Sequence, residues 1–215
     1  MKHTYALFLT LAAGGPLIAQ GPAADLLQGK LPADAVAQVR AIAAQASARA
    51  LPATPLVQKA LEGAAKGVAP ARIVAAVQVL ADQLSSAAGA IHDAGVAIPD
   101  SASVEAGAFA LNAGLDAGQV RALARAAGLS GKRATALRVA GTLAALGVPP
   151  KQSVDLVTRS VDSTADLNTL SGQVEAGMAH GESAAAAAAG LGHGARPATA
   201  NPHRPVTPQG GSRKP

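Results

Sequence analysis

The sequence predicts an all-α protein, because its composition, its spacing of apolar residues and its glycine and proline positions all favour helices. Apolar residues make up 49% of the 215 residues, alanine supplies much of that share, and aromatic residues account for only 1%. Alanine is the strongest helix former, whereas strands favour β-branched and aromatic side chains. Apolar residues recur at steps of three and four between glycines and prolines, which end helices and restart them. We therefore expect about eight short helices.

The first nineteen residues have the order of a secretory signal peptide. Lys2 and His3 form a short positive start, an apolar run follows over residues 5–13, and residues 14–16 break it. The apolar stretch is too short and too interrupted to span a hydrocarbon core of about 30 Å, which takes about 20 apolar residues. We expect residues 1–19 to be a signal peptide, so that the chain is exported to the periplasm or out of the cell.

Cleavage after Ala19 is the leading expectation, with cleavage after Ala23 or Ala24, or retention of the leader as a membrane tether, as the alternatives. Residues 20–32 then form an N-terminal linker, and no transmembrane helix is expected in the mature chain. Phe109 would be the only aromatic residue left after cleavage. Nucleic-acid bases stack on aromatic side chains, so no nucleic-acid partner is expected.

A helical domain is expected over residues 33–180, beginning with three helices. The first runs over residues 33–50, and the second over residues 56–67, where Glu62 and Lys66 have the spacing of a helical ion pair. The third begins at Pro70, because a helix tolerates proline in its first turn. Its apolar residues recur at steps of four, three and four: Ile73, Val77, Leu80 and Leu84.

Two further helices are expected before residue 128. Pro99 and Asp100 open the first, which ends at Gly114. Asp116 opens the second, because Gln119 follows it at the spacing of a capping box.

Capping residues and glycines also mark the starts and ends of the last three expected helices. Ser130 caps the first of them, which ends at Gly147. The next carries Asp155 and Arg159 at ion-pair spacing, and the last begins near Ser163.

A repeated unit recurs among these boundaries. Gly29, Gly67 and Gly147 are each followed by an apolar residue and then by proline, and Gly114 is a looser copy. A helix stop, a tight turn and a helix start predict antiparallel helical hairpins. The glycines are 38, 47 and 33 residues apart, so an irregular bundle and a short solenoid both remain open.

One of these hairpins carries a resemblance to other proteins. The sequence Lys59-Ala-Leu-Glu-Gly-Ala-Ala-Lys-Gly-Val-Ala-Pro-Ala-Arg-Ile-Val-Ala-Ala-Val77 resembles uncharacterised, exported, alanine-rich helical-hairpin proteins of high-GC bacteria. The resemblance covers that hairpin alone. It implies a fold and a location but no function.

Residues 181–215 are expected to form a disordered tail. Glycine, proline and alanine dominate this segment, so it buries too little surface to offset the entropy of ordering. Its cations face a single acidic residue, Glu182, and they are Arg196, Arg204, Arg213 and Lys214. The tail is therefore either a solubilising end or a contact with an anionic surface.

Composition and motifs exclude several kinds of chemistry. The chain has no cysteine, which rules out disulfides, thiolate metal sites and a cysteine nucleophile. Ser183 follows Gly181 and Glu182 as in an esterase nucleophile elbow, but the second glycine is missing. Residues 128–133 resemble part of a phosphate-binding loop, but Arg133 stands where a magnesium-binding hydroxyl belongs. We expect no catalytic or cofactor-binding residue in either pattern.

The histidines and paired carboxylates do not have the spacing of a metal or acid–base site. Asp162 and Asp166 fall in the first turn of a predicted helix, where negative charge is favoured in any case. Histidines that lie in a tail or a turn cannot hold metal geometry unaided. These histidines are His92, beside Asp93, and His180, His193 and His203. No metal and no cofactor are expected.

The leading hypothesis is a non-enzymatic envelope protein whose helical hairpins provide an interaction surface, with another envelope protein as its partner. Its basis is the leader, the hairpins and the lack of catalytic motifs. The alternative is an enzyme or small-ligand carrier whose site is assembled from residues distant in sequence. The residues considered for such a site are Arg72, Asp82, His92 and Arg121.

Overall fold

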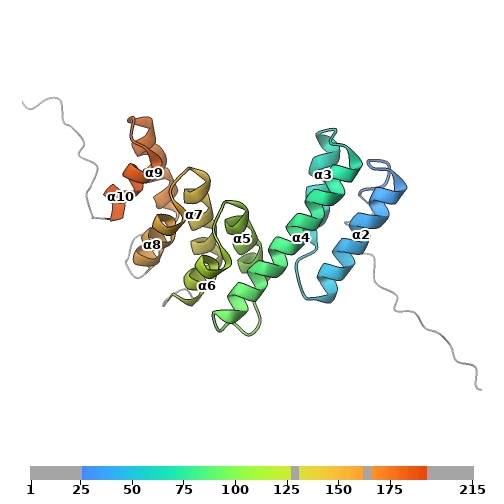
Figure 1. Ribbon diagram of the computed structural model, residues 1–215, viewed down its shortest axis with the longest axis horizontal. Helices are drawn as coiled ribbons and strands as arrows, with labels where there is room; N and C mark the ends of the chain where they lie inside the picture. Colours follow the sequence, from blue (N-terminus) through green and yellow to red (C-terminus); the bar gives the residue numbers. More distant parts are fainter. Residues whose placement is uncertain (1–25, 127–130, 162–165, 193–215) are drawn as a thin grey trace, which may run out of the picture. The chain divides into compact units, whose positions relative to one another are not determined.

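The computed structural model describes residues 26–126, 131–161 and 166–192, and the predicted all-α class is confirmed there. These residues form nine helices and no strand (Figure 1), one helix more than expected. The helices are α2 (Ala33–Ala48), α3 (Thr54–Ala65), α4 (Pro70–Asp93), α5 (Ser101–Asn112), α6 (Ala117–Arg125), α7 (Arg133–Ala145), α8 (Pro150–Val161), α9 (Thr169–Ala179) and α10 (Ala184–Gly192).

Contacts divide the chain into two compact units, which we call unit 1 (residues 1–81) and unit 2 (residues 82–215). Unit 1 contains α2, α3 and the first half of α4, and unit 2 contains the second half of α4 and all later helices. The boundary lies inside a continuous helix of 24 residues. The helical domain predicted over residues 33–180 spans this boundary.

The core of unit 1 is built from aliphatic residues of three helices and one turn. Leu56 of α3 and Val77 of α4 are fully buried, and α2 packs against α3. A Cβ placed on Gly63 would lie 2.8 Å from Ile73 Cγ1, so α3 and α4 approach closely at this glycine. Leu27 is also fully buried, which anchors part of the expected linker to unit 1.

The core of unit 2 depends on close contact between α5 and its neighbours. A Cβ on Gly141 of α7 would lie 2.8 Å from the Phe109 ring and 3.0 Å from Ala110 Cα on α5. On the other side of α5, a Cβ on Gly107 would lie 3.0 Å from Ala87 Cβ on α4. Glycine is therefore required where these helices meet, because any side chain would force them apart.

The predicted glycine stops are confirmed at Gly67, Gly114 and Gly147. Their φ angles are +66°, +104° and +96°, in the left-handed region that glycine adopts without steric penalty. The N–H of the next residue then donates to the carbonyl five residues back, as between Val148 and Leu143 at 3.0 Å. This Schellman turn satisfies carbonyls at the helix end and turns the apolar residue inward, so Val148 is buried.

The same turn also occurs where the sequence analysis did not place it. Gly95 has a φ of +98°, and Val96 N–H donates to the Ile91 carbonyl. Ala50 has a φ of +57° without being glycine, and the chain reverses there to begin α3 at Thr54.

The predicted capping residues Asp100 and Asp116 and the predicted ion pair between Glu62 and Lys66 are confirmed. Asp100 accepts hydrogen bonds from Ser103 N at 2.8 Å and from Ser103 Oγ at 2.7 Å. The hydroxyl of Ser103 is the main reason that the pKa of Asp100 lies below its usual range. The Asp116 capping box forms, with both of its hydrogen bonds to Gln119 present. The predicted ion pair between Asp155 and Arg159 is wrong, because Asp155 pairs with Lys151 instead.

One ion pair and two helix starts in the later part of the chain differ from expectation. Asp155 pairs with Lys151 at 2.9 Å, while Arg159 lies against the end of α10, 2.7 Å from where a Gly192 Cβ would be. The helix after residue 130 begins at Arg133 with Lys132 as its N-cap residue, and Ser130 lies outside the described residues. The second helix start that differs from expectation follows Asp166.

The helix expected near Ser163 begins instead at Thr169. Asp166 makes a turn first, because its Oδ1 accepts from Asn168 N at 2.9 Å and its carbonyl accepts from the Thr169 hydroxyl. Such Asx turns compete with helix formation. Residues 162–165 lie outside the described residues.

Residues 184–192 form a helix, where a disordered tail was expected from residue 181. Helix α10 packs against α8 and α9, and Gln152 Nε2 donates to the Ala185 carbonyl at 2.7 Å. A Cβ on Gly177 would lie 2.7 Å from Ala187 Cβ, so alanine methyl groups pack directly on a helix backbone. The composition argument gave no weight to the burial of alanine methyl groups, which stabilises α10 here. Residues 193–215 lie outside the described residues.

Helix α4 is, among the described helices, the one long and apolar enough by length and composition to cross a membrane. The core helices of soluble proteins pass the same test. In α4 the apolar residues Ile73, Leu84 and Ile91 are buried in the protein, while Arg72 and His92 are exposed. One face of α4 is therefore buried, as in an amphipathic helix, while Val79 on the same helix is 55% exposed.

Replacing Ala50 by glycine is expected to stabilise the protein by about 1 kcal/mol, because a non-glycine residue pays about 1–2 kcal/mol in the left-handed region. Gly147→Ala is expected to destabilise it by a similar amount, since its added methyl group meets only Ala184 Cβ at 3.9 Å and the effect is conformational. Urea denaturation of both variants measures these changes. A lower midpoint for Ala50→Gly would show that the turn does not strain residue 50.

Gly141→Ala is expected to destabilise the protein by about 1–3 kcal/mol, because the new methyl group overlaps the Phe109 ring and the α5 backbone. Gly172→Ala in α9 is the matched control, since nothing lies within 4 Å of its Cβ position. Alanine is the better helix former, so this control is expected to gain up to about 1 kcal/mol. Equal effects at both positions, measured by thermal unfolding, would contradict close packing of α5 on α7.

A chain ending at Gly192 is expected to unfold at the same temperature as the full chain, whereas one ending at Ser183 is expected to unfold at a lower temperature. The shorter chain loses α10 and exposes the α8 and α9 surfaces that Ala184, Ala187 and Ala188 cover. Calorimetry distinguishes the two. Identical melting of the two shortened chains would mean that α10 adds nothing to the fold.

Candidate functional site

Two open grooves lie on the described surface. The first, which we call the Leu61 groove, belongs to unit 1 and has a volume of about 620 Å³. It is lined by Leu26, Lys30, Leu61, Glu62, Ala64 and Ala65. The second, which we call the Arg125 groove, lies between α6 and α8 in unit 2 and has a volume of about 540 Å³. It is lined by Ala122, Arg125, Ala126, Val154, Asp155, Thr158 and Arg159.

The Leu61 groove is formed by a turn and the C-terminal half of α3. The N–H groups of Lys30 and Leu31 donate to the Leu27 carbonyl at 3.1 and 3.3 Å, which closes the turn. Leu27 is anchored in the core, and its neighbour Leu26 remains 57% exposed at the groove. Helix α3 contributes Leu61 together with two alanines, whose short side chains leave the hollow unfilled.

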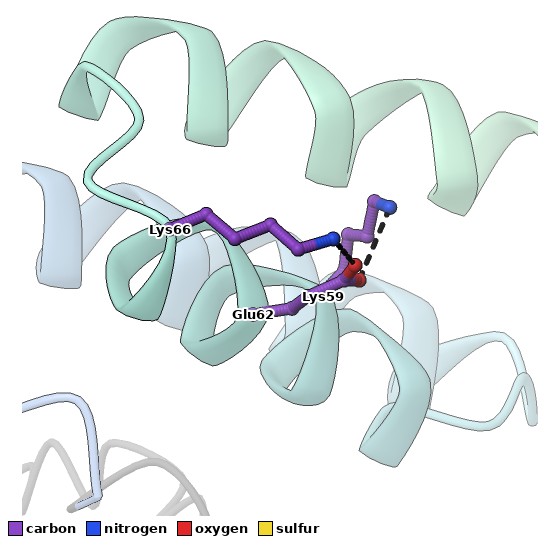
Figure 2. A network of polar contacts seen from close by, with 3 residues as sticks. All are labelled: Lys59, Glu62 and Lys66. Carbon is purple, nitrogen blue, oxygen red and sulfur yellow. Dashed lines mark hydrogen bonds and ion pairs between the residues drawn. The ribbon is translucent and has the colours of Figure 1, made fainter.

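Glu62 of α3 lines the Leu61 groove, and two lysines of the same helix contact it. Figure 2 shows the Glu62 carboxylate between Lys59 and Lys66, with the Lys59 Nζ to Glu62 Oε2 distance at 3.3 Å. The hydrogen bond from Lys66 is the largest cause of the lowered pKa of Glu62, followed by that from Lys59. Exposed pairs of this kind contribute little to stability. Lys30 lines the groove as well, and Lys59 and Lys66 both contact its Glu62.

Positive charge is concentrated in the part of the chain that carries this groove. Residues 26–81 contain six lysines and arginines but only two acidic residues, Asp34 and Glu62. Residues 82–192 contain seven basic and ten acidic residues. The positive net charge of the chain therefore comes from residues 26–81 and from residues 193–215, which contain four basic residues and no acidic one.

The charged side chains of the Arg125 groove already contact the protein itself. Arg125 Nη2 donates to the Asp93 carbonyl at 2.8 Å, at the end of α4. Asp155 pairs with Lys151, and Arg159 lies against the end of α10. The contacts of Arg125 and Arg159 join helices of unit 2, and the Asp155 pair lies within α8, so each of these charged side chains has a role in the fold.

The four residues considered for an assembled active site do not come together at either groove. Arg72, Asp82, His92 and Arg121 are all exposed, and none of them lines a groove. His92 Nδ1 lies 3.8 Å from Asp93 Oδ1, its sequence neighbour. General acid–base chemistry requires groups held together at a substrate, and these positions do not supply that arrangement.

The motifs set aside in the sequence analysis have structural roles where they are described. Ser183 Oγ accepts from Ala186 N at 3.2 Å at the start of α10. Arg133 Nη1 lies 4.0 Å from Asp100 Oδ2, which brings the starts of α5 and α7 together. His180 is the C-cap residue of α9. Within the described residues, no cluster of histidine and acidic side chains could hold a metal ion.

Several members of these motifs lie outside the described residues. They are Gly128, Ser130, Asp162, His193 and His203.

Sequence reasoning missed the Leu61 groove. Leu26 and Lys30 were assigned to a linker, and Leu61 was treated only as part of a hairpin. The adjacent pair Leu26 and Leu27 was the available signal, because two large apolar residues are unusual in a flexible linker.

No family model, curated protein or solved structure matches the chain. The resemblance of residues 59–77 to exported alanine-rich proteins therefore stays a prediction. The function has to be argued from the chain's own residues.

Proposed function

We propose that this protein is an exported, non-enzymatic envelope protein that binds another protein through the surface of its helical hairpins. The Leu61 groove supports the proposal most directly, because it combines an open apolar floor with Lys30 in its lining and two further lysines that contact its Glu62. Apolar surface that stays exposed beside charged residues is typical of a binding site. The proposal of export rests on the order of residues 2–19, which lie outside the described residues.

The pKa values of the carboxyl groups favour a binding function over a catalytic one. Catalytic acids and bases have shifted pKa values because they are held in apolar pockets. Within the described residues, two carboxyl groups have clearly shifted pKa values, Glu62 and Asp100. Hydrogen bonds from lysines lower the pKa of Glu62 and those from Ser103 lower the pKa of Asp100, and both side chains are exposed. These shifts are those of a surface ion pair and a helix cap.

The basic tail supplies a second proposed contact, with an anionic surface such as lipid head groups or cell-wall polymer. Its lysine and arginine residues lie beyond α10, in residues 193–215. Deletion should therefore begin at residue 193, because α10 belongs to the fold. Loss of salt-sensitive retention in the envelope would support the tail contact, and unchanged retention at low salt would contradict it.

Crosslinking in intact cells of the native host, followed by purification and mass spectrometry, is expected to recover a partner protein of the envelope. A chain lacking residues 1–19 is the control, since it should stay in the cytoplasm and lose that partner. Recovery of the mature chain alone, in repeated experiments, would contradict the interaction proposal. Equal recovery of the partner without residues 1–19 would contradict export.

A further inference from the structure

We propose that the Leu61 groove binds an acidic amphipathic segment of a partner protein. Large apolar side chains of that segment fill the groove, and its carboxylates contact Lys30, Lys59 and Lys66. This inference rests on the proposed function and adds the site and the chemistry of the partner.

The shape of the groove fits a short segment with apolar anchors. Its volume of about 620 Å³ lies within the range of about 300–1,000 Å³ typical of binding pockets. Leu61, Ala64 and Ala65 are spaced i, i+3 and i+4 on α3, so the floor is about one helical turn long. Helices that bind in grooves insert apolar anchors at this same spacing. The groove therefore accepts one turn of an amphipathic helix.

The charge at the groove selects an acidic segment. Lys66 and Lys59 are 66% and 46% exposed, so carboxylates from outside can reach their ammonium groups. Both lysines now share Glu62, and an exposed pair of this kind is weak enough to rearrange. The excess of basic residues over residues 26–81 extends the positive potential beyond the groove itself. Such complementarity raises association rates and rejects basic partners.

The concave shape favours a protein segment over a lipid surface. A bilayer contacts protruding apolar side chains, and here Leu26 protrudes while Leu61 and Ala64 are half-buried inside the hollow. A leucine or isoleucine side chain of a peptide can enter that hollow. Burial of such a side chain contributes roughly 1.5–3 kcal/mol, which is enough to anchor a short segment.

The test uses the mature full chain and a fluorescent designed peptide about 15 residues long, close to the shortest length that is helical in water. The peptide has leucines on one face and glutamates elsewhere. Fluorescence anisotropy is expected to show binding that weakens with salt. A peptide with lysine in place of glutamate, and one with serine in place of leucine, are expected to bind at least about tenfold more weakly, a difference of about 1.4 kcal/mol.

Matched variants locate the binding site. The pair Lys30→Glu with Lys66→Ala is expected to weaken binding by at least about tenfold, as is Leu26→Ser alone. Arg72→Glu with Arg49→Ala changes the net charge of unit 1 equally but touches no groove residue, so binding should change less than about twofold. Circular dichroism of each variant checks that the helices remain folded.

Several outcomes would overturn the groove proposal. Equal binding of the acidic and basic peptides would show that the protein does not select acidic segments. Equal binding by the groove variants and the control variant would show that the peptide does not bind at the Leu61 groove. Binding of anionic phospholipid vesicles without binding of the peptide would point to a membrane. Self-association lost in Leu26→Ser would point to a second copy of the chain.

Crosslinking of the Lys30→Glu with Lys66→Ala variant in cells separates this proposal from the proposed function. Loss of the envelope partner supports the groove. A partner that is retained by this variant overturns the groove and leaves the interaction function standing. No partner for either the variant or the unchanged chain contradicts the proposed function itself.

Discussion

Contact between helix backbones through glycine and alanine is the constraint on which the rest of this structure depends. An aromatic-poor, alanine-rich chain gains little from each buried side chain, so its helices must approach closely to gain enough dispersion energy. Gly141 lets α7 reach the Phe109 ring and the α5 backbone, and Gly177 lets α9 reach Ala187 of α10. A single added methyl group at either position would separate two helices.

The turns follow from this constraint. Close packing of neighbouring helices requires the chain to reverse within a few residues, and the left-handed residue at each helix end provides that reversal. After Gly67 the next helix begins three residues later, at Pro70, and after Gly147 it also begins three residues later, at Pro150. The apolar residue between them, such as Val148, seals the end of the helix against the core. The chain makes the same reversal at Ala50, where a non-glycine residue adopts the left-handed conformation at a steric cost.

The candidate site arises from the same chemistry at the surface. Where alanines such as Ala64 and Ala65 face outward beside a leucine, they leave a hollow that no side chain of the groove fills. The charged groups lie around that hollow and remain in solvent, so they can recognise a partner's charge but are not held for acid–base catalysis. A protein packed in this way has surface hollows with charged groups around them, which a partner protein can recognise.

The sequence by itself determined the all-α class, the helix stops at Gly67 and Gly147, and the capping box at Asp116. Each depends on residues within one turn, so local spacing is sufficient. It could not determine α10, whose alanines are buried only because Gly177 leaves room for them. Nor could it determine the groove or the division inside α4, because Leu26 and Leu61 are brought together only by folding. Those features depend on contacts between distant residues, which tertiary packing alone decides.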